Sequence, residues 1–246
     1  RRLFSYKVYK FEVRLRTILH MGIRMNHKKI RRLMRKYGLY CPVRKANPYR
    51  RMAKAMRTNA VADNLLKREF RLRGPRKVFL TDITYIPFND SFLYLSVIMD
   101  SFTDEVLSYV LSESLEVDFV LQTVKQFIVK HGTTLDSEAI IHSDQGCHYT
   151  STSFRAIVSD YGLRQSMSRR GNCWDNAPQE SFFGHMKQEI QFKTRKCLSF
   201  SAVQEVIDDW IDYYNKDRYK AALDNLSPNE FYKYITTGEY PLKMLH

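Results

Sequence analysis

The pattern of apolar and polar positions changes at about residue 78. After this point come three strand-like runs rich in Val, Ile, Leu, Tyr and Phe, with short polar turns between them. The runs cover residues 78–87, 92–99 and 105–111. Runs of this length and composition predict three consecutive strands arranged as a meander.

Helical spacing alternates with short apolar runs in the next part of the chain. Residues 116–131 have apolar positions at helical intervals, and residues 139–141 form a short apolar run that leads into Asp144. A helical pattern at 152–161, a strand at 163–167 and a helix that begins near Pro178 follow. This order predicts an α/β fold with a mixed five-stranded sheet flanked by helices, which is the element order of the ribonuclease H-like fold.

The first 40 residues have a different, basic pattern. Residues 8–20 show helical spacing and a glycine turn follows; Asn26 suits a helix N-cap, and Gly38 suits the position after a helix end. Basic residues cover the other faces of this second helix: Lys28, Lys29, Arg31, Arg32 and Arg35. Helix, turn and basic helix is the outline of a helix-turn-helix, so we expect a DNA-binding segment over 1–40. The alternative is an ordinary solvated basic helix.

Two further regions complete the division of the chain. Residues 41–77 contain Pro, Gly and many basic residues, and predict a basic linker with a helix near 58–70. We place a catalytic core at 78–195. Residues 196–246 are expected to form a helical extension, because apolar residues from Val203 to Tyr214 make one helical stripe.

The charge is distributed unevenly. The net charge is +14, yet residues 1–80 hold 25 Lys and Arg against three Asp and Glu, a net of +22, and residues 81–246 have a net of −8. A basic front half indicates a polyanionic partner such as DNA, although a solvated basic surface has the same composition. No apolar run approaches the ~20 residues of a membrane span. Four widely spaced cysteines indicate free thiols in a reducing cytoplasm.

Three acids stand out, each with an ordinary alternative. Asp82 lies inside an apolar strand, where a buried hydroxyl or Arg could satisfy it. Asp144 ends a strand and could be a turn acid, and Glu180 in the first turn of a helix could be a capping-box acid. Together, three carboxylates with few His or Cys nearby suit Mg²⁺ or Mn²⁺, and two such ions would promote chemistry at a phosphodiester.

The segments around these acids resemble those of a known family. Thr81–Ile86, Tyr94–Asp100, His142–Gly146 and Ser166–Phe183 are similar to segments of the DDE transposases of bacterial insertion sequences, in the copy-out, paste-in group related to retroviral integrases. The 35 residues between Asp144 and Glu180 have the spacing typical of that superfamily. The chain lacks an initiator Met, so we expect a fragment or a processed product.

The resemblance implies a function and further site residues. Asp82, Asp144 and Glu180 become the catalytic and metal-binding triad, and Lys187 a DNA contact two helical turns after Glu180. Contacts with DNA near the site are expected from Arg169, Arg170, Asn172 and Trp174. His142 and His148 are interpreted as scaffolding or DNA contacts rather than metal ligands, and Asp100 as a structural acid.

The expected activity is metal-dependent cleavage and strand transfer of the element's DNA. Its partners would be the terminal inverted repeats and the target DNA, further copies of the chain, and the product of an upstream reading frame. No membrane is expected; the location would be the bacterial cytoplasm, at the nucleoid. The alternatives are a ribonuclease H-like nuclease that does not join DNA and an inactive DNA-binding repressor.

Overall fold

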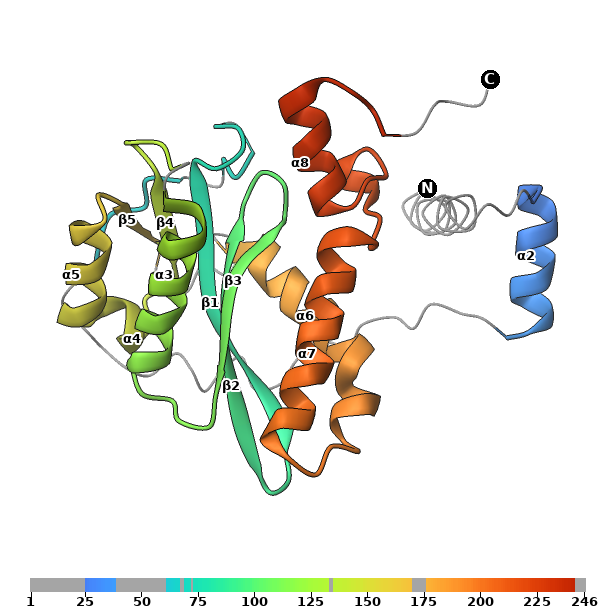
Figure 1. Cartoon of the computed structure of the whole chain (residues 1–246), viewed down its shortest axis with the longest axis horizontal. Helices are drawn as coiled ribbons and strands as arrows, with labels where there is room; N and C mark the ends of the chain where they lie inside the picture. Colours follow the sequence, from blue (N-terminus) through green and yellow to red (C-terminus); the bar gives the residue numbers. More distant parts are fainter. Residues whose placement is uncertain are drawn as a thin grey trace. The chain divides into compact units, whose positions relative to one another are not determined.

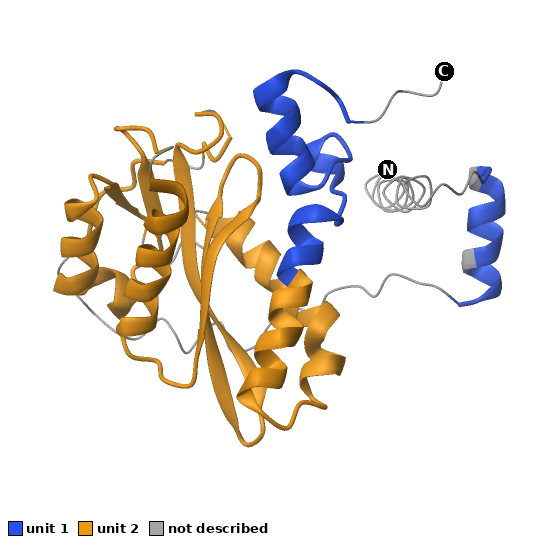
Figure 2. Cartoon of the chain, in the orientation of Figure 1, with its two compact units in different colours: residues 1–45, 211–246 blue, residues 46–210 orange. Residues whose placement is uncertain are grey.

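The structure is a computed structural model that describes residues 25–38, 61–66, 69–71, 73–132, 135–169 and 176–241 (Figure 1). The chain divides into two compact units (Figure 2). One comprises residues 46–210, and the other combines residues 1–45 with 211–246.

The unit of residues 46–210 is built on a mixed five-stranded sheet, as predicted. Its strands are β1 (Val78–Phe88), β2 (Ser91–Asp100), β3 (Val106–Ser112), β4 (Ile140–Ser143) and β5 (Arg164–Met167). They lie in the order β3-β2-β1-β4-β5. The first three are antiparallel, whereas β1, β4 and β5 are parallel. The central strand β1 is therefore the place where the meander meets the parallel half.

Helices follow the strands in the expected order. They are α3 (Asp118–His131), α4 (Cys147–Thr150), α5 (Thr152–Asp160), α6 (Ala177–Thr194) and α7 (Phe200–Lys216). Helix α3 packs with α5 over a core that includes Phe79 of β1. Asn176, at the start of α6, instead bonds to Asp82 of the same strand. Because side chains alternate along a strand, residues 79 and 82 point to opposite faces, so α3 and α6 cover opposite faces of the sheet.

The core under α3 is made of large, fully buried side chains. Phe79 and Phe127 meet edge to face with ring centroids 4.7 Å apart, and neither ring is exposed. Ile141 of β4 and Phe154 of α5 belong to the same cluster. Burying a Phe, Leu or Ile side chain contributes about 1.5–3 kcal/mol, so this cluster fixes β1 against β4 and both against the helices.

The helix expected near 58–70 is absent from the described part of that range. Residues 61–66 are irregular and lie beside β5 instead. The Leu65 N–H donates to Ser166 Oγ at 3.0 Å, and the Met167 N–H donates to the Asp63 carbonyl at 3.2 Å. The side chain of Leu66 is buried. The prediction was wrong because contacts with a strand that lies 100 residues further on satisfy this backbone, and helix propensity does not include them.

The other unit contains a helix that was predicted in the basic front. Helix α2 (His27–Lys36) begins after Asn26, whose Oδ1 accepts from the Lys28 N–H at 2.8 Å, and Gly38 has a φ of 60°. The five basic residues singled out on α2 are all exposed. Residues 8–20 lie outside the described ranges, so the helix-turn-helix stays a prediction.

The same unit contains the end of the chain. It includes the last residues of α7, the 3-10 helix η4 (Ala221–Leu223) and helix α8 (Pro228–Thr237). Helix α8 begins with a capping box, in which Ser227 and Glu230 bond to each other's backbone. No helix among the described residues is long and apolar enough to cross a membrane.

A buried ion network holds the end of β2. Asp100 is inaccessible to solvent and accepts from the N–H groups of Arg76 (3.1 Å) and Phe102 (2.9 Å) and from the Thr103 hydroxyl (3.2 Å). Arg76 also bonds to Glu105 at 2.6 Å. Burial raises the pKa of Asp100, and the hydrogen bonds and the Arg76 charge only partly oppose this. The structural role expected for Asp100 is confirmed.

Replacing Asp100 with Ala should lower the free energy of unfolding by about 2–4 kcal/mol, because several buried donors lose their acceptor. Asp100→Asn should lose less, since Asn retains an acceptor oxygen and removes a charge that burial disfavours. Urea denaturation measures the free energy of unfolding of both variants. Asp90→Ala, in the exposed turn before β2, is the control and should stay within about 0.5 kcal/mol of the unchanged chain. Equal losses for Asp100→Ala and Asp90→Ala would contradict the prediction.

Candidate active site

Asp82 occupies the middle of β1, opposite Val97 of β2. Its side chain is half-buried, and Oδ1 accepts from the Ile83 N–H at 2.8 Å. Oδ2 accepts from the Asn176 side-chain amide at 3.3 Å. This bond links the strand acid to the residue before α6, which is the helix that contains Glu180.

Asp144 follows β4 and lies beside Asp82 because of the strand register. The parallel pairing of β1 with β4 ends at Leu80 and His142. Asp82 comes two residues later in β1, and Asp144 comes two residues after His142, directly after the end of β4. Neighbouring strands of a sheet are about 4.8 Å apart, so this register directs both acids to the same edge of the sheet. Both carboxylates raise the pKa of the Tyr149 hydroxyl, after the larger effect of its complete burial, so both charges act on the same buried ring.

The environment of Asp144 disfavours its charge. The residue has a large exposed area, yet the protein atoms around its carboxyl group raise its pKa by removing water from it. The Gly146 N–H, which donates to Oδ1 at 2.8 Å, and the nearby His148 oppose this shift. Asp144 is thus a turn acid, as one alternative proposed, and also a neighbour of Asp82.

Glu180 is not a capping-box acid. Helix α6 begins at Ala177, so Glu180 is its fourth residue, and the Asn176 side chain makes no capping bond. A capping box needs Glu or Gln at the third position, where Gln179 lies, and needs a bond from the N-cap side chain. The Asn176 amide is directed at Asp82 instead. Glu180 is half-buried in the first turn, where the helix dipole favours a negative charge.

Asp82, Asp144 and Glu180 do not converge into a complete metal site. Among the described residues, no group of three His, Cys, Asp or Glu side chains converges closely enough to hold a metal ion. What the structure brings together is the pair of Asp82 and Asp144, with the start of α6 attached to Asp82 through Asn176. Carboxylates without a cation repel each other, which gives a physical reason for a more open arrangement.

Both histidines near Asp144 are held by the protein. His142 is fully buried, with Nδ1 2.9 Å from Ser166 Oγ and Nε2 3.1 Å from Ser168 Oγ. His148 Nε2 lies 2.6 Å from the Leu115 carbonyl oxygen. These contacts agree with a scaffolding role, since His142 ties the end of β4 to β5 next to Asp144.

The remaining expected site residues are spread over both units. Lys187 lies on α6, seven residues and about 10 Å along the helix from Glu180. Arg169 is exposed just after β5. Arg170, Asn172 and Trp174 lie outside the described residues. The basic residues of α2 belong to the other unit.

Sequence reasoning missed Asn176, Tyr149 and Tyr85 as neighbours of the acids. Asn176 was visible only as a polar residue before a Pro-containing helix start, and nothing in the pattern directed its amide to Asp82. The phenol of Tyr85 is also affected by both aspartates, which raise its pKa after burial, Tyr94 and Cys147. These are contacts between distant segments, and local patterns do not encode them.

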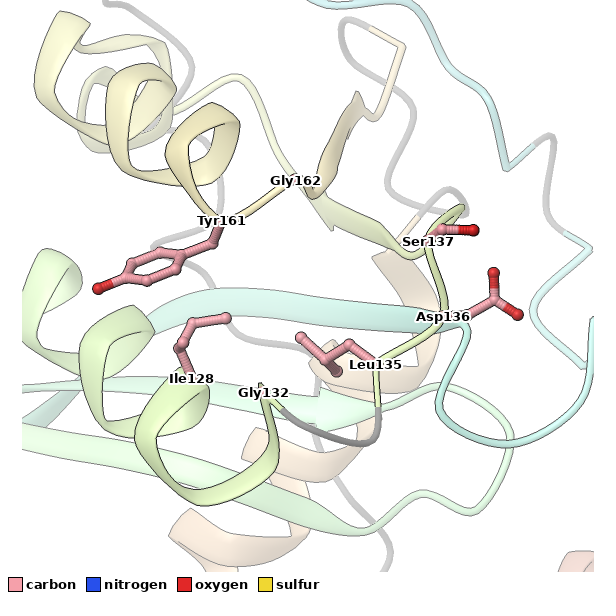
Figure 3. Close-up of a pocket in the computed structure, with 7 residues that line it drawn as sticks. All are labelled: Ile128, Gly132, Leu135, Asp136, Ser137, Tyr161 and Gly162. Atoms are coloured by element: carbon pink, nitrogen blue, oxygen red, sulfur yellow. The ribbon is translucent and has the colours of Figure 1, made fainter.

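A cavity elsewhere in this unit is separate from the acids. It has a volume of about 520 Å³ and is lined by Ile128, Gly132, Leu135, Asp136, Ser137, Tyr161 and Gly162 (Figure 3). Its residues 135–137 precede β4, whereas Asp144 follows the other end of that strand. The acids therefore lie at the opposite end of β4 from this cavity.

Comparison with known proteins identifies two family matches. The "Integrase core domain" family matches residues 73–173, and a second model with the same description matches residues 161–228. Several solved structures share the fold. A chain of the simian T-cell lymphotropic virus intasome has a TM-score of 0.57 at 14% identity, with 80% of this chain and 67% of that chain covered. The BIV integrase catalytic core has a TM-score of 0.52 at 16% identity, with 67% and 99% covered.

Curated relatives are similar along most of the sequence. A transposase-like protein of Haemophilus influenzae is 36% identical over 212 residues, which cover 85% of this chain and 94% of the relative. The putative transposase InsK of the element IS150 of Escherichia coli is 35% identical, with 85% and 72% covered. The transposase of IS904 from Lactococcus lactis is 34% identical, with 90% and 87% covered.

Three findings identify the family of this chain. They are the five-stranded mixed sheet, the neighbouring aspartates at the end of its parallel half, and the sequence similarity along most of the length of these relatives. The chain belongs to the DDE-type insertion-sequence transposases of the retroviral integrase superfamily, with the activity of a polynucleotidyl transferase.

Proposed function

We propose that Asp82, Asp144 and Glu180 are the catalytic triad of this transposase, and that they hold divalent metal ions at the DNA phosphate. The observation that supports this most strongly is the β1–β4 register, which brings Asp82 next to Asp144. The bond from Asn176 to Asp82 places the start of the helix with Glu180 at the same strand.

The donor set fits Mg²⁺ or Mn²⁺ in kind. Carboxylate oxygens are the ligands that these hard cations prefer. The pKa of Asp144 is raised because burial disfavours its negative charge, and a neighbouring cation would stabilise that charge. The catalytic core of HTLV-2 integrase, solved in complex with magnesium, shares the fold with a TM-score of 0.50 at 15% identity. Two bound ions would neutralise charge on the phosphate and activate the attacking oxygen.

The chain's own residues position this site. The Asn176 amide holds one oxygen of Asp82, the Gly146 N–H holds one oxygen of Asp144, and His142 fixes the strand end that presents Asp144. We propose that water first attacks a phosphodiester at the element end and releases a 3′-hydroxyl. That hydroxyl then attacks a target phosphodiester, and the displaced 3′ oxygen leaves as a hydroxyl.

The DNA is proposed to be held by basic residues outside the acid pair. Arg169 and Lys187 belong to the same unit as the acids, and α2 presents six exposed Lys and Arg side chains. Contacts of this kind depend on salt because phosphate binding releases counterions. Since two element ends must be joined to one target, we propose that several copies assemble on DNA, with the upstream reading-frame product as a further partner.

The charge of Asp144 can be removed with little change of shape. In Asp144→Asn, an oxygen remains for the Gly146 N–H, so the fold should persist while cleavage and joining fall by about 10²–10³-fold. The assay measures cleavage and joining of terminal-repeat oligonucleotides in the presence of Mg²⁺, and calorimetry measures Mg²⁺ binding. Asp160→Asn, at the exposed end of α5, is the control and should leave both unchanged.

The same assay separates the proposal from its alternatives. Full activity of Asp144→Asn would refute the triad. If the unchanged chain cuts the DNA and joins none, it is a nuclease. If it binds DNA and neither cuts nor takes up Mg²⁺, it is an inactive DNA-binding protein.

Gly146 offers a test of how accurately Asp144 must be placed. A Cβ atom at residue 146 would lie 2.9 Å from Asp144 Oδ1, which is too close, so the carboxylate would have to move. The backbone at Gly146 has a φ of −64°, which Ala adopts without strain. Gly146→Ala should therefore reduce strand transfer by about 10²-fold, the cost of a misplaced catalytic group, and hardly affect the melting temperature.

A second glycine provides the matched control. Gly132 also has an ordinary φ of −55°, and its added Cβ would meet Ile128 Cγ2 at 3.2 Å. It lines the cavity at the opposite end of β4 from the acids. Gly132→Ala should leave strand transfer unchanged. A wild-type rate for Gly146→Ala would show that the turn does not position the Asp144 carboxylate.

A further inference from the structure

Three aromatic rings form a group on the β1–β2 hairpin. Tyr85 pairs with Tyr94 in the strand register, and Pro87 pairs with Phe92, so the three rings share one face of the sheet. The Tyr85 ring meets the Tyr94 ring at 5.3 Å and the Phe92 ring at 6.1 Å, both edge to face. We call Tyr85, Phe92 and Tyr94 the aromatic platform.

The platform remains open to solvent. Tyr85 is 44% exposed and Phe92 48% exposed, and Tyr94 is partly buried. Strand β1 pairs with β4 only from Val78 to Leu80. The hairpin from residue 81 onward therefore extends past the end of β4 (Figure 1).

The platform lies next to the acid pair. Tyr85 follows Asp82 by three residues, about 10 Å along the strand. The two side chains point to opposite faces, yet Asp144 and Cys147, which come after the end of β4, act on the Tyr85 hydroxyl. Burial, Tyr94, Cys147, Asp144 and Asp82 raise the pKa of Tyr85, in that order of size. The phenol therefore lies within the electrostatic reach of both aspartates.

We infer that the aromatic platform is a stacking site for an unpaired DNA base next to the phosphodiester that reacts at Asp82 and Asp144. The inference rests on the proposed function, since it needs a DNA strand at these acids. Every base has a flat π-face that stacks on Tyr or Phe whatever its sequence. An uncharged ring surface beside two carboxylates suits a base better than a phosphate, because the carboxylates repel a phosphate that no cation accompanies.

Base stacking at this position would assist the reaction. A strand end separates from its partner only if the lost stacking is replaced, and an exposed aromatic ring replaces it. A base held on Tyr85 also restricts the adjoining phosphodiester to the space in front of Asp144. The platform thus positions the substrate, whereas the acids take part in the reaction.

The ordinary explanation of the three rings is that they stabilise the hairpin. Cross-strand aromatic pairs do so in many sheets. The two explanations differ for Tyr85→Leu, which retains apolar contact with Tyr94 and Phe92 but removes the ring. Hairpin packing alone predicts a wild-type reaction rate for this variant, and base stacking predicts a loss.

The test uses the full chain and duplexes of its element's own terminal repeat, with 2-aminopurine at each nucleotide next to the scissile phosphate. Stacking on Tyr85 should quench the emission of the flipped 2-aminopurine in the wild type and in Tyr85→Phe. In Tyr85→Leu the emission should rise, and strand transfer should fall roughly 5- to 150-fold, the scale of one base–aromatic stack. Tyr161→Leu is the control, because Tyr161 is 46% exposed but lies at the other end of β4.

A substrate without the base separates stacking from a folding defect. Removing the base at the quenched position should slow the wild type by the same factor, and Tyr85→Leu should then be no slower than the wild type. The inference is overturned if Tyr85→Leu joins normal ends at the wild-type rate. It is also overturned if the loss of rate from the substitution and the loss from the missing base multiply when the two are combined. A wild-type chain that joins no ends would instead refute the proposed function, and stacking would then have no reaction to assist.

Discussion

The parallel pairing of β1 with β4 is the interaction on which the site depends. Three residue pairs, from Val78 with Ile140 to Leu80 with His142, set the register of the two strands. The period of a strand is two residues, so a shift by one residue would turn Asp144 to the other face. In the register that these pairs set, Asp82 and Asp144 each come two residues after the last pair, Leu80 with His142.

Burial keeps this register fixed. Val78, Phe79 and Leu80 have no exposed surface, and neither does Ile140. A slip would bring polar groups into that core at a cost of several kcal/mol. The hydrogen bonds of His142 with two serines act in the same direction, because they join β4 to β5 at the level of Asp144. The apolar core therefore supplies the stability, and the buried polar contacts fix the end of β4 next to Asp144.

The sequence predicted the sheet well, for a physical reason. The strands β1 to β3 are long apolar runs, and the helices between the later strands have clear periodicity, so local patterns and the final fold agree. Residues 61–66 show the limit, since their backbone bonds to β5 rather than to itself. No local pattern contains a partner that lies 100 residues away.

The site was predictable in its residue types and less so in its geometry. The acids could be identified because a carboxylate in an apolar strand is costly unless it has a partner or a bound cation. In addition, the spacing between Asp144 and Glu180 is typical of the transposase superfamily. The role of Asn176 could not be selected, since an Asn before a helix normally caps that helix. Here the tertiary contact with Asp82 replaces the local one, and Glu180 lies in the first turn of the helix, where the dipole favours a negative charge.

The charges around the acids support a division of roles between the parts of this transposase. Burial raises the pKa of Asp144, and a second carboxylate, that of Asp82, acts on the same buried Tyr149 ring. A phosphate would add a further negative charge next to these two carboxylates, and a divalent cation would offset it. Under the proposed function, affinity for the DNA backbone is assigned to basic residues elsewhere in the sequence, such as those of α2. Next to the acids, uncharged surfaces like that of Tyr85 can contact a nucleotide without competing for the cation, which is why an aromatic face beside two carboxylates is chemically consistent with phosphodiester transfer.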